Sequence, residues 1–236
     1  MKVYFVTSGL REEMEVIRKV RPPRLLCSYW YFKNRCLREF CCNIGYQPEI
    51  MLDSGAYSAF TKGRNVNLFD YMKYIEENAD HITRYVALDV IGDPFTTKAY
   101  YGIMQHKGFD PIPVFHCGDD LSVMQYYVTN GAKVVALGNT VKIRDKEEVA
   151  QWCKEIHELY TDISLHLLGS SSQKIIDCGA LASCDSSSWY VRAVNGHPES
   201  IPGKTRPSKL ARAEANMVRI MEVFNEIPIP VDNRCG

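Results

Sequence analysis

The chain has 236 residues, of which 46% are hydrophobic and 24% are charged. This composition is typical of a globular protein that builds its core without disulfides or metals. The formal net charge of +0 leaves only local basic clusters as a source of polyanion binding. No apolar stretch approaches the ~20 residues of a membrane helix, so no membrane association is expected. The nine cysteines are interpreted as reduced thiols of a cytoplasmic protein.

Short apolar runs alternate with amphipathic segments along the chain. Strands are predicted at 2–9, 49–55, 84–94, 111–120, 132–140, 163–172 and 180–189. Helices are predicted over 10–20 and 68–82 from apolar residues at helical spacing, and a last helix begins after Ser208 as its N-cap. Runs that are apolar throughout are typical of parallel strands buried on both faces.

Repeated βα units are compatible with a (β/α)₈ barrel or an open doubly wound sheet. Seven strands are evident, whereas the eighth is not, because residues 190–208 are polar and rich in proline. We expect a single α/β domain over 1–236, a TIM-type barrel whose eighth βα unit is irregular or incomplete.

Acidic residues follow several of the predicted strands. Asp53 ends the second strand, Asp89 follows the third, and Asp185 follows the last. In a parallel barrel the carboxyl ends of all strands open on one face, where active sites lie. A single such aspartate is weak evidence, because Asp also caps helices, but three of them predict a carboxylate-rich site. The small residues after Asp53 are expected to leave room for a planar ligand.

The stretches LDSGAYSAF, VALDVIGDP, PVFHCG, VALGN, HLLGSSS and CDSSSW occur in this order between residues 49 and 189. Their order resembles the tRNA-guanine transglycosylase superfamily, and within it the short, phage-type members thought to insert 7-deazaguanines into DNA. The resemblance implies a queuosine-related pentosyltransferase that exchanges guanine in DNA for a base such as preQ0, without a cofactor. It also implies DNA, or tRNA, and the free base as partners, and the host cytoplasm as the location of a phage-encoded protein.

The resemblance assigns roles to matching residues. Asp185 matches the nucleophile that attacks C1′ and forms a covalent sugar ester. Asp53 matches the acid that moves a proton to and from the base, and Asp89 matches the acid that reads the purine-like edge. The other predicted substrate-binding residues are Ser54, Gly55, Tyr57, His116, Gly138 and Gly169. Of these, Tyr57 is expected to stack on the base, and His116 stands where the tRNA enzymes usually have glutamine.

The sequence departs from the tRNA enzymes after the nucleophile. They have Pro-Thr-Arg there and then a Cys-x-Cys-x-x-Cys plus His zinc site, whereas this chain reads DSSSWYVRAVNG and has only Cys235 beyond Asp185. The cysteines at 27, 36, 41 and 42 match no tetrahedral spacing. No metal site is therefore predicted, and buried thiols are the expected role.

A basic segment from Arg18 to Arg38 holds seven Lys and Arg residues and no acid, with four aromatic residues at 29–32. Basic side chains supply phosphate contacts and exposed rings stack on bases. The predicted nucleic-acid-binding residues are Arg21, Arg24, Lys33, Arg35, Lys204, Arg206 and Lys209.

Three other functions remain open from the sequence. The same exchange on tRNA would use the same acids, and so would a glycosylase or nucleosidase in which water replaces the incoming base. A non-catalytic nucleic-acid-binding barrel is the third, since fold alone does not prove function. The identity of the 7-deazaguanine, the target sequence and the oligomeric state are left undetermined.

Overall fold

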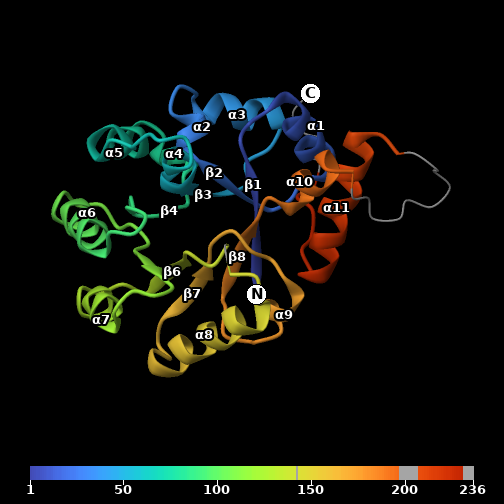
Figure 1. Ribbon diagram of the computed structural model, residues 1–236. Helices are drawn as coiled ribbons and strands as arrows, with labels where there is room; N and C mark the ends of the chain where they lie inside the picture. The colour runs from blue at the N-terminus through green and yellow to red at the C-terminus, as the bar shows by residue number, and fades with distance from the viewer. Residues whose placement is uncertain (142, 197–206, 231–236) are drawn as a thin grey trace.

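A computed structural model describes residues 1–141, 143–196 and 207–230. Its eight strands are all parallel and follow the order β4-β3-β2-β1-β8-β7-β6-β5. The strands are β1 (Lys2–Thr7), β2 (Arg24–Ser28), β3 (Glu49–Asp53), β4 (Arg84–Tyr85), β5 (Val114–His116), β6 (Val134–Gly138), β7 (Ser164–Leu167) and β8 (Ser183–Ser186). A parallel bridge between Val86 and Ile112 joins the two edges of this sheet, so the chain forms a (β/α)₈ barrel, as predicted (Figure 1).

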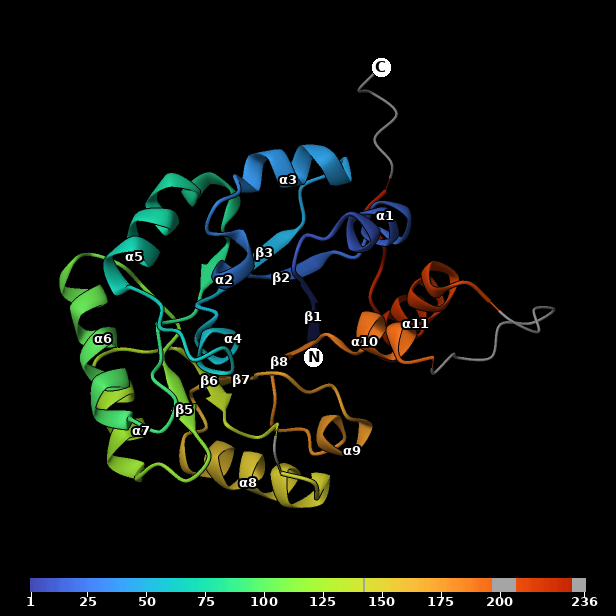
Figure 2. The ribbon, with the colours of Figure 1, turned by 45° about the horizontal axis from the view of Figure 1, so that its top comes forward.

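Helices follow each strand and surround the barrel (Figure 2). They are α1 (Arg11–Val20), α2 (Tyr29–Phe32), α3 (Leu37–Ile44), α4 (Ala56–Phe60), α5 (Leu68–Glu77), α6 (Pro94–His106), α7 (Leu121–Thr129), α8 (Lys146–Leu159), α9 (Gln173–Ile176), α10 (Ser188–Val194) and α11 (Lys209–Val223), with a 3₁₀ turn at Ala79–His81. The predicted N-cap of the last helix is confirmed, because Ser208 Oγ accepts a hydrogen bond from the Ala211 N–H at 3.2 Å. Across the described residues, no helix has both the length and the apolar character needed to span a bilayer.

The strand that the sequence did not reveal is β2. It lies inside the basic segment and pairs with β1 on one side and β3 on the other. The last βα unit is complete, since β8 leads into α10 and α11. Of the polar stretch 190–208, residues 197–206 lie outside the described residues.

Two apolar layers hold the barrel together. Alternate strand residues point inward and fill its interior, whereas the others pack under the helices. The interior cluster consists of Tyr4, Leu26, Met51, Val86, Ile112, Val114 and Ala136. In the outer layer, Trp189 of α10 is fully buried and donates from Nε1 to the Val6 carbonyl at 3.0 Å. Because these described side chains fill the interior, a ligand cannot enter the barrel and must bind beyond the strand ends.

Candidate active site

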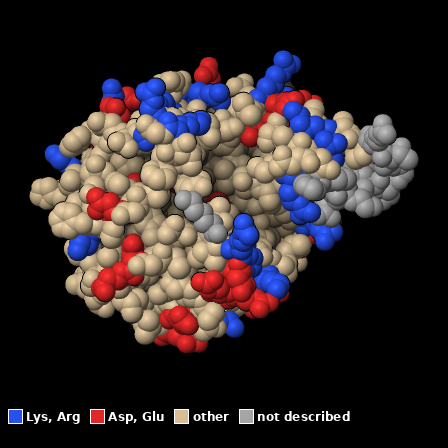
Figure 3. Space-filling view, viewed as in Figure 1, with Lys and Arg blue, Asp and Glu red and all other residues tan. Residues whose placement is uncertain are grey.

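A cavity of about 300 Å³ opens at the carboxyl ends of the strands, a volume at the lower end of that of small-molecule sites. It appears as a hollow near the centre of the face in Figure 3. Of the predicted catalytic and substrate-binding residues, those that line it are Asp53, Tyr57, Asp89, His116, Gly138, Gly169 and Asp185. Their strands lie far apart in the sequence, and barrel closure brings them together.

Asp53 is the last residue of β3 and one of the three carboxylates on the cavity. Its Oδ2 accepts a hydrogen bond from the Gly55 N–H at 2.9 Å. Burial, followed by the negative charges of Asp89 and Asp185, raises the pKa of Asp53 to about 7, although the Gly55 N–H opposes this shift. Asp53 can therefore both donate and accept a proton near neutral pH.

Gly55 contributes to packing and does not line the cavity. Its φ of +74° is left-handed, and a Cβ built on it would lie 2.6 Å from the Trp30 Cβ. The absence of a side chain thus lets α4 approach α2 closely. The room that the sequence suggested for a ligand at this position is occupied by Trp30. Ser54 does not line the cavity either, and its side chain is fully buried.

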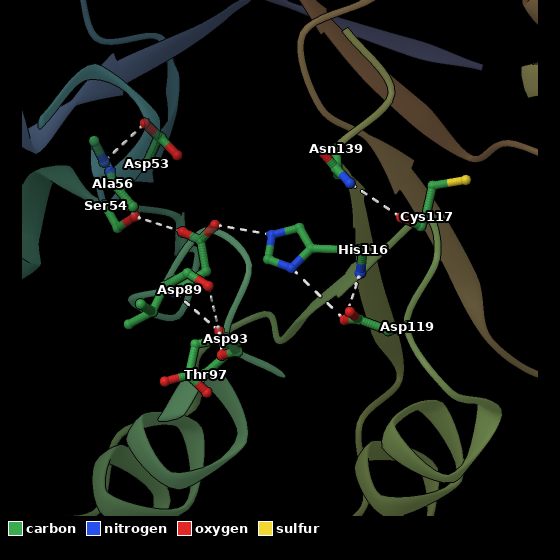
Figure 4. Close-up of polar contacts among 12 residues, drawn as sticks. Asp53, Ser54, Ala56, Asp89, Asp93, Thr97, His116, Cys117, Asp119 and Asn139 are labelled. Carbon is green, nitrogen blue, oxygen red and sulfur yellow. Dashed lines mark hydrogen bonds and ion pairs between the residues drawn. The ribbon is translucent and has the colours of Figure 1, made fainter. Parts of the chain in front are cut away.

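A chain of polar contacts runs from Ser54 through Asp89 and His116 to Asp119 (Figure 4). Ser54 Oγ donates to Asp89 Oδ1 at 3.2 Å, and the other oxygen of Asp89 lies 3.0 Å from His116 Nε2. On the far side of the ring, His116 Nδ1 lies 3.6 Å from Asp119 Oδ2. These contacts hold Asp89 in one orientation. Each of its oxygens can accept a further hydrogen bond, and the residue lines the cavity.

The imidazole of His116 faces a carboxylate at each nitrogen. Burial lowers the pKa of His116, but the hydrogen bond and charge of Asp89, together with the charge of Asp119, outweigh burial and raise it above 6.5. A Cβ on Gly138 would come within 2.7 Å of His116 Cδ2, so the absence of a side chain there leaves room for the imidazole beside β6. His116 is therefore engaged in fixing Asp89.

Asp185 lies on β8 at the cavity floor. Both of its carboxylate oxygens lie 3.0 Å from the Gly169 backbone nitrogen, which donates to them. His166, which the sequence analysis missed, is fully buried below, with Nε2 3.4 Å from Asp185 Oδ1 and Nδ1 2.8 Å from Ser183 Oγ. These contacts fix the carboxylate while leaving it on the cavity surface.

Comparisons with known proteins bear on the fold alone. No family model and no curated protein matches the chain. A Coccidioides immitis protein assigned as a fructose-1,6-biphosphate aldolase is 11% identical, with a TM-score of 0.57 over 95% of this chain and 89% of that one. The YdjI aldolase of Escherichia coli K12 is 14% identical, with a TM-score of 0.54 over 95% and 90%. The chain shares their fold. At such identities the likeness does not extend to their activity.

The residues predicted to bind nucleic acid lie in different parts of the barrel. Lys33 and Arg35 follow the carboxyl end of β2 and belong to the face with the cavity. The guanidinium of Arg35 donates to the Ser8 and Gly9 carbonyls at 3.2 and 2.7 Å. Lys209 is bound to Glu12, which neutralises its charge. Lys204 and Arg206 lie outside the described residues.

Arg21 and Arg24 lie at the opposite end of the barrel. Arg21 precedes β2, and Arg24 is its first residue. Arg24 is largely buried and forms ion pairs with Glu226 and Glu49. Arg21 donates to the Ile229 carbonyl at 2.7 Å and lies over the Tyr46 ring. These two arginines therefore lie away from the cavity, and both side chains are engaged in contacts within the protein.

Replacing Arg24 by glutamine should destabilise the protein without weakening DNA binding. The Glu226 carboxylate, only 6% exposed, would lose its partner, which costs on the order of 3 kcal/mol. Urea unfolding measures this loss, and Arg38→Gln on the exposed surface of α3 is the control, expected within about 0.5 kcal/mol of wild type. Unchanged stability together with weaker DNA binding would restore Arg24 to the nucleic-acid surface.

The cysteines considered for metal binding do not form a cluster of ligands. The prediction of buried thiols is confirmed for Cys27 and Cys41 and is wrong for Cys36 and Cys42, which are exposed. Burial raises the pKa of the Cys41 thiol to about 12, as expected for a thiol that packs as a small apolar group. Among all described residues, no group of three or more His, Cys, Asp or Glu side chains is arranged to hold a metal ion.

Proposed function

We propose that the protein exchanges guanine in DNA for a 7-deazaguanine base such as preQ0 through a covalent sugar–aspartyl intermediate. One observation carries the proposal: three carboxylates from separate strands face one small cavity, and their surroundings differ. Asp185 is fixed by a backbone N–H, Asp89 is fixed by His116 and Ser54, and Asp53 has a pKa near 7. A carboxyl group that holds a proton near pH 7 beside two fixed carboxylates suits general acid–base catalysis.

Asp185 is the nucleophile in the first half of the proposed reaction. Its carboxylate oxygen forms an ester bond to C1′ of the target nucleotide as the bond from C1′ to the purine nitrogen breaks. The electron pair of that bond stays with the departing guanine, and the Asp53 carboxyl supplies the proton that neutralises it.

The second half reverses these steps with the new base. Asp53, now ionised, accepts the ring N–H proton of the incoming 7-deazaguanine. The freed nitrogen attacks C1′, and the ester to Asp185 breaks with its electron pair on the carboxylate. One base replaces another, so the enzyme is regenerated and no cofactor is consumed.

Asp89 is proposed to recognise the base. Guanine and its 7-deaza analogues present a ring N–H and an exocyclic amine on one edge. Both groups are hydrogen-bond donors that suit a fixed carboxylate. His116 and Ser54 hold Asp89 for this contact. Tyr57, which lines the cavity and is 46% exposed, offers a ring on which the base stacks.

An exchange assay tests the proposal. DNA that carries labelled guanine is incubated with the protein and a panel of free 7-deazaguanines, with tRNA in parallel. Release of guanine with an equal gain of the new base in DNA is the expected result. Exchange confined to tRNA would change the substrate, and release without incorporation would indicate a glycosylase in which water attacks the ester. Absence of release from either nucleic acid would overturn the proposal.

A further inference from the structure

A basic groove lies beside the active-site cavity. It is an open groove of about 500 Å³, lined by Trp30, Lys33, Lys62, Arg64 and Asn65. The first two residues come from α2 and its C-terminal end, and the other three from the loop between α4 and α5. In Figure 3, basic side chains gather over α2 and α4 at the edge of the hollow. Of these cations, only Lys33 belongs to the residues predicted from the sequence to bind nucleic acid.

The three cations of the groove are available to a ligand. Lys33 Nζ lies 4.3 Å and Lys62 Nζ 5.6 Å from the centroid of the Trp30 ring. Apart from such ring contacts, none of the three side chains forms a hydrogen bond or ion pair with another described residue. This distinguishes them from Arg24 and Lys209, whose charges are already paired. The groove lining includes no carboxylate.

The groove and the cavity share a wall. Tyr31, the residue after Trp30, lines the cavity, and Lys62 Nζ lies 5.1 Å from the centroid of its ring. Arg64 also borders a cleft that reaches Asp89. Because Gly55 lets α4 pack closely on α2, these two elements are held together. A chain molecule with one unit in the cavity can therefore place its next units in the groove.

We infer that the groove binds the phosphodiester backbone of the strand on one side of the target nucleotide. This inference rests on the proposed function and makes its substrate a polymer, because a free nucleoside has no phosphate for the three cations. Lys and Arg contacts to phosphates supply most of the affinity for single strands, and an indole adds stacking for a neighbouring base. With a net charge of +0, the protein depends on such a local cluster to hold a polyanion.

The inference is tested by the salt dependence of binding to a labelled single-stranded DNA of 12 nucleotides, a length chosen as roughly one single-strand site. The variant combines Lys33→Gln, Lys62→Gln and Arg64→Gln. Each lost phosphate contact makes the negative slope of log K against log salt shallower by about 0.7, so the slope of the variant should be shallower by about 2. Its affinity at low salt should fall at least about tenfold. The matched control combines Lys107→Gln, Lys133→Gln and Lys154→Gln, three exposed lysines elsewhere, and should retain the wild-type slope.

Equal weakening by both triple variants, or by neither, would overturn the inference. Binding of polyglutamate through the three groove cations, without binding of DNA, would assign the groove to an acidic protein segment and overturn it as well. The binding assay requires no catalysis. If the protein binds DNA through the groove but exchanges no base, the groove assignment stands and the proposed function is overturned. If the groove variant exchanges bases as well as wild type, the proposed function stands and the groove assignment is overturned.

Discussion

Replacing Asp185 by asparagine should abolish base exchange and leave the fold intact. The amide is close in shape to the carboxylate and can still accept the Gly169 N–H that now contacts Asp185 at 3.0 Å, but it cannot form the ester to C1′. Loss of a nucleophile of this kind lowers turnover by at least about 10⁴-fold. Guanine release from DNA measures turnover, and the melting temperature reports the fold.

The covalent intermediate provides a second measurement of the same prediction. Without an incoming base, wild-type protein should accumulate an adduct with DNA that survives denaturation and migrates slowly on a gel. Asp185→Asn should form none while binding DNA as before. Asp162→Asn, in the exposed loop before β7, is the control and should behave as wild type. An adduct in the Asp185 variant would require another nucleophile.

The sequence located the carboxylates of the cavity but did not separate them from acids that cap helices. Asp93 and Asp120 also follow strands, and each is the N-cap of the next helix, where its side chain accepts from a backbone N–H. Asp53, Asp89 and Asp185 instead line the cavity. Whether an aspartate caps a helix depends on the few residues that follow it. Whether it lines the cavity depends on barrel closure, which short-range sequence patterns do not encode.

The sequence missed β2 because its signal is short and has atypical neighbours. Only Leu25, Leu26 and Cys27 are apolar in succession, after two prolines and Arg24. Its pairing with β1 and β3 supplies the stability that local propensity does not. His166 was missed for a related reason: it is a single polar residue between Leu165 and Leu167, and only the alternation of strand side chains places it under Asp185.

The same strand explains why the predicted nucleic-acid surface was divided. In sequence, Arg21 and Arg24 adjoin Lys33 and Arg35 as one basic segment. A strand rises about 3.3 Å per residue, so five residues of β2 separate the two pairs by roughly the height of the barrel. The first pair lies at the end that holds Glu226 and the second at the cavity. Clustering of charge in sequence therefore did not predict clustering on the surface.

The rate of guanine release should fall as the pH rises through about 7. The departing base takes its proton from Asp53, and only the protonated carboxyl, whose pKa is about 7, can donate it. Single-turnover release without an incoming base isolates this step. Incorporation of the new base needs ionised Asp53, so the full exchange should show a bell-shaped profile around neutrality. In Asp53→Asn the release should be slowed by about 10²- to 10⁴-fold and should lose this pH dependence.

Protein stability reports the same proton without any substrate. The pKa of Asp53 is raised from 3.8 to about 7 by folding, so between these pH values the native chain holds a proton that the unfolded chain has released. As the pH rises from about 4 to about 7, the contribution of Asp53 to the free energy of unfolding therefore falls by at most about 4 kcal/mol. Above about pH 7 it is constant. Asp53→Asn removes this term, so the variant should gain stability relative to wild type between pH 5 and pH 8. If the free energies of unfolding of the two proteins changed equally with pH across this range, Asp53 would ionise normally and could not serve as the acid.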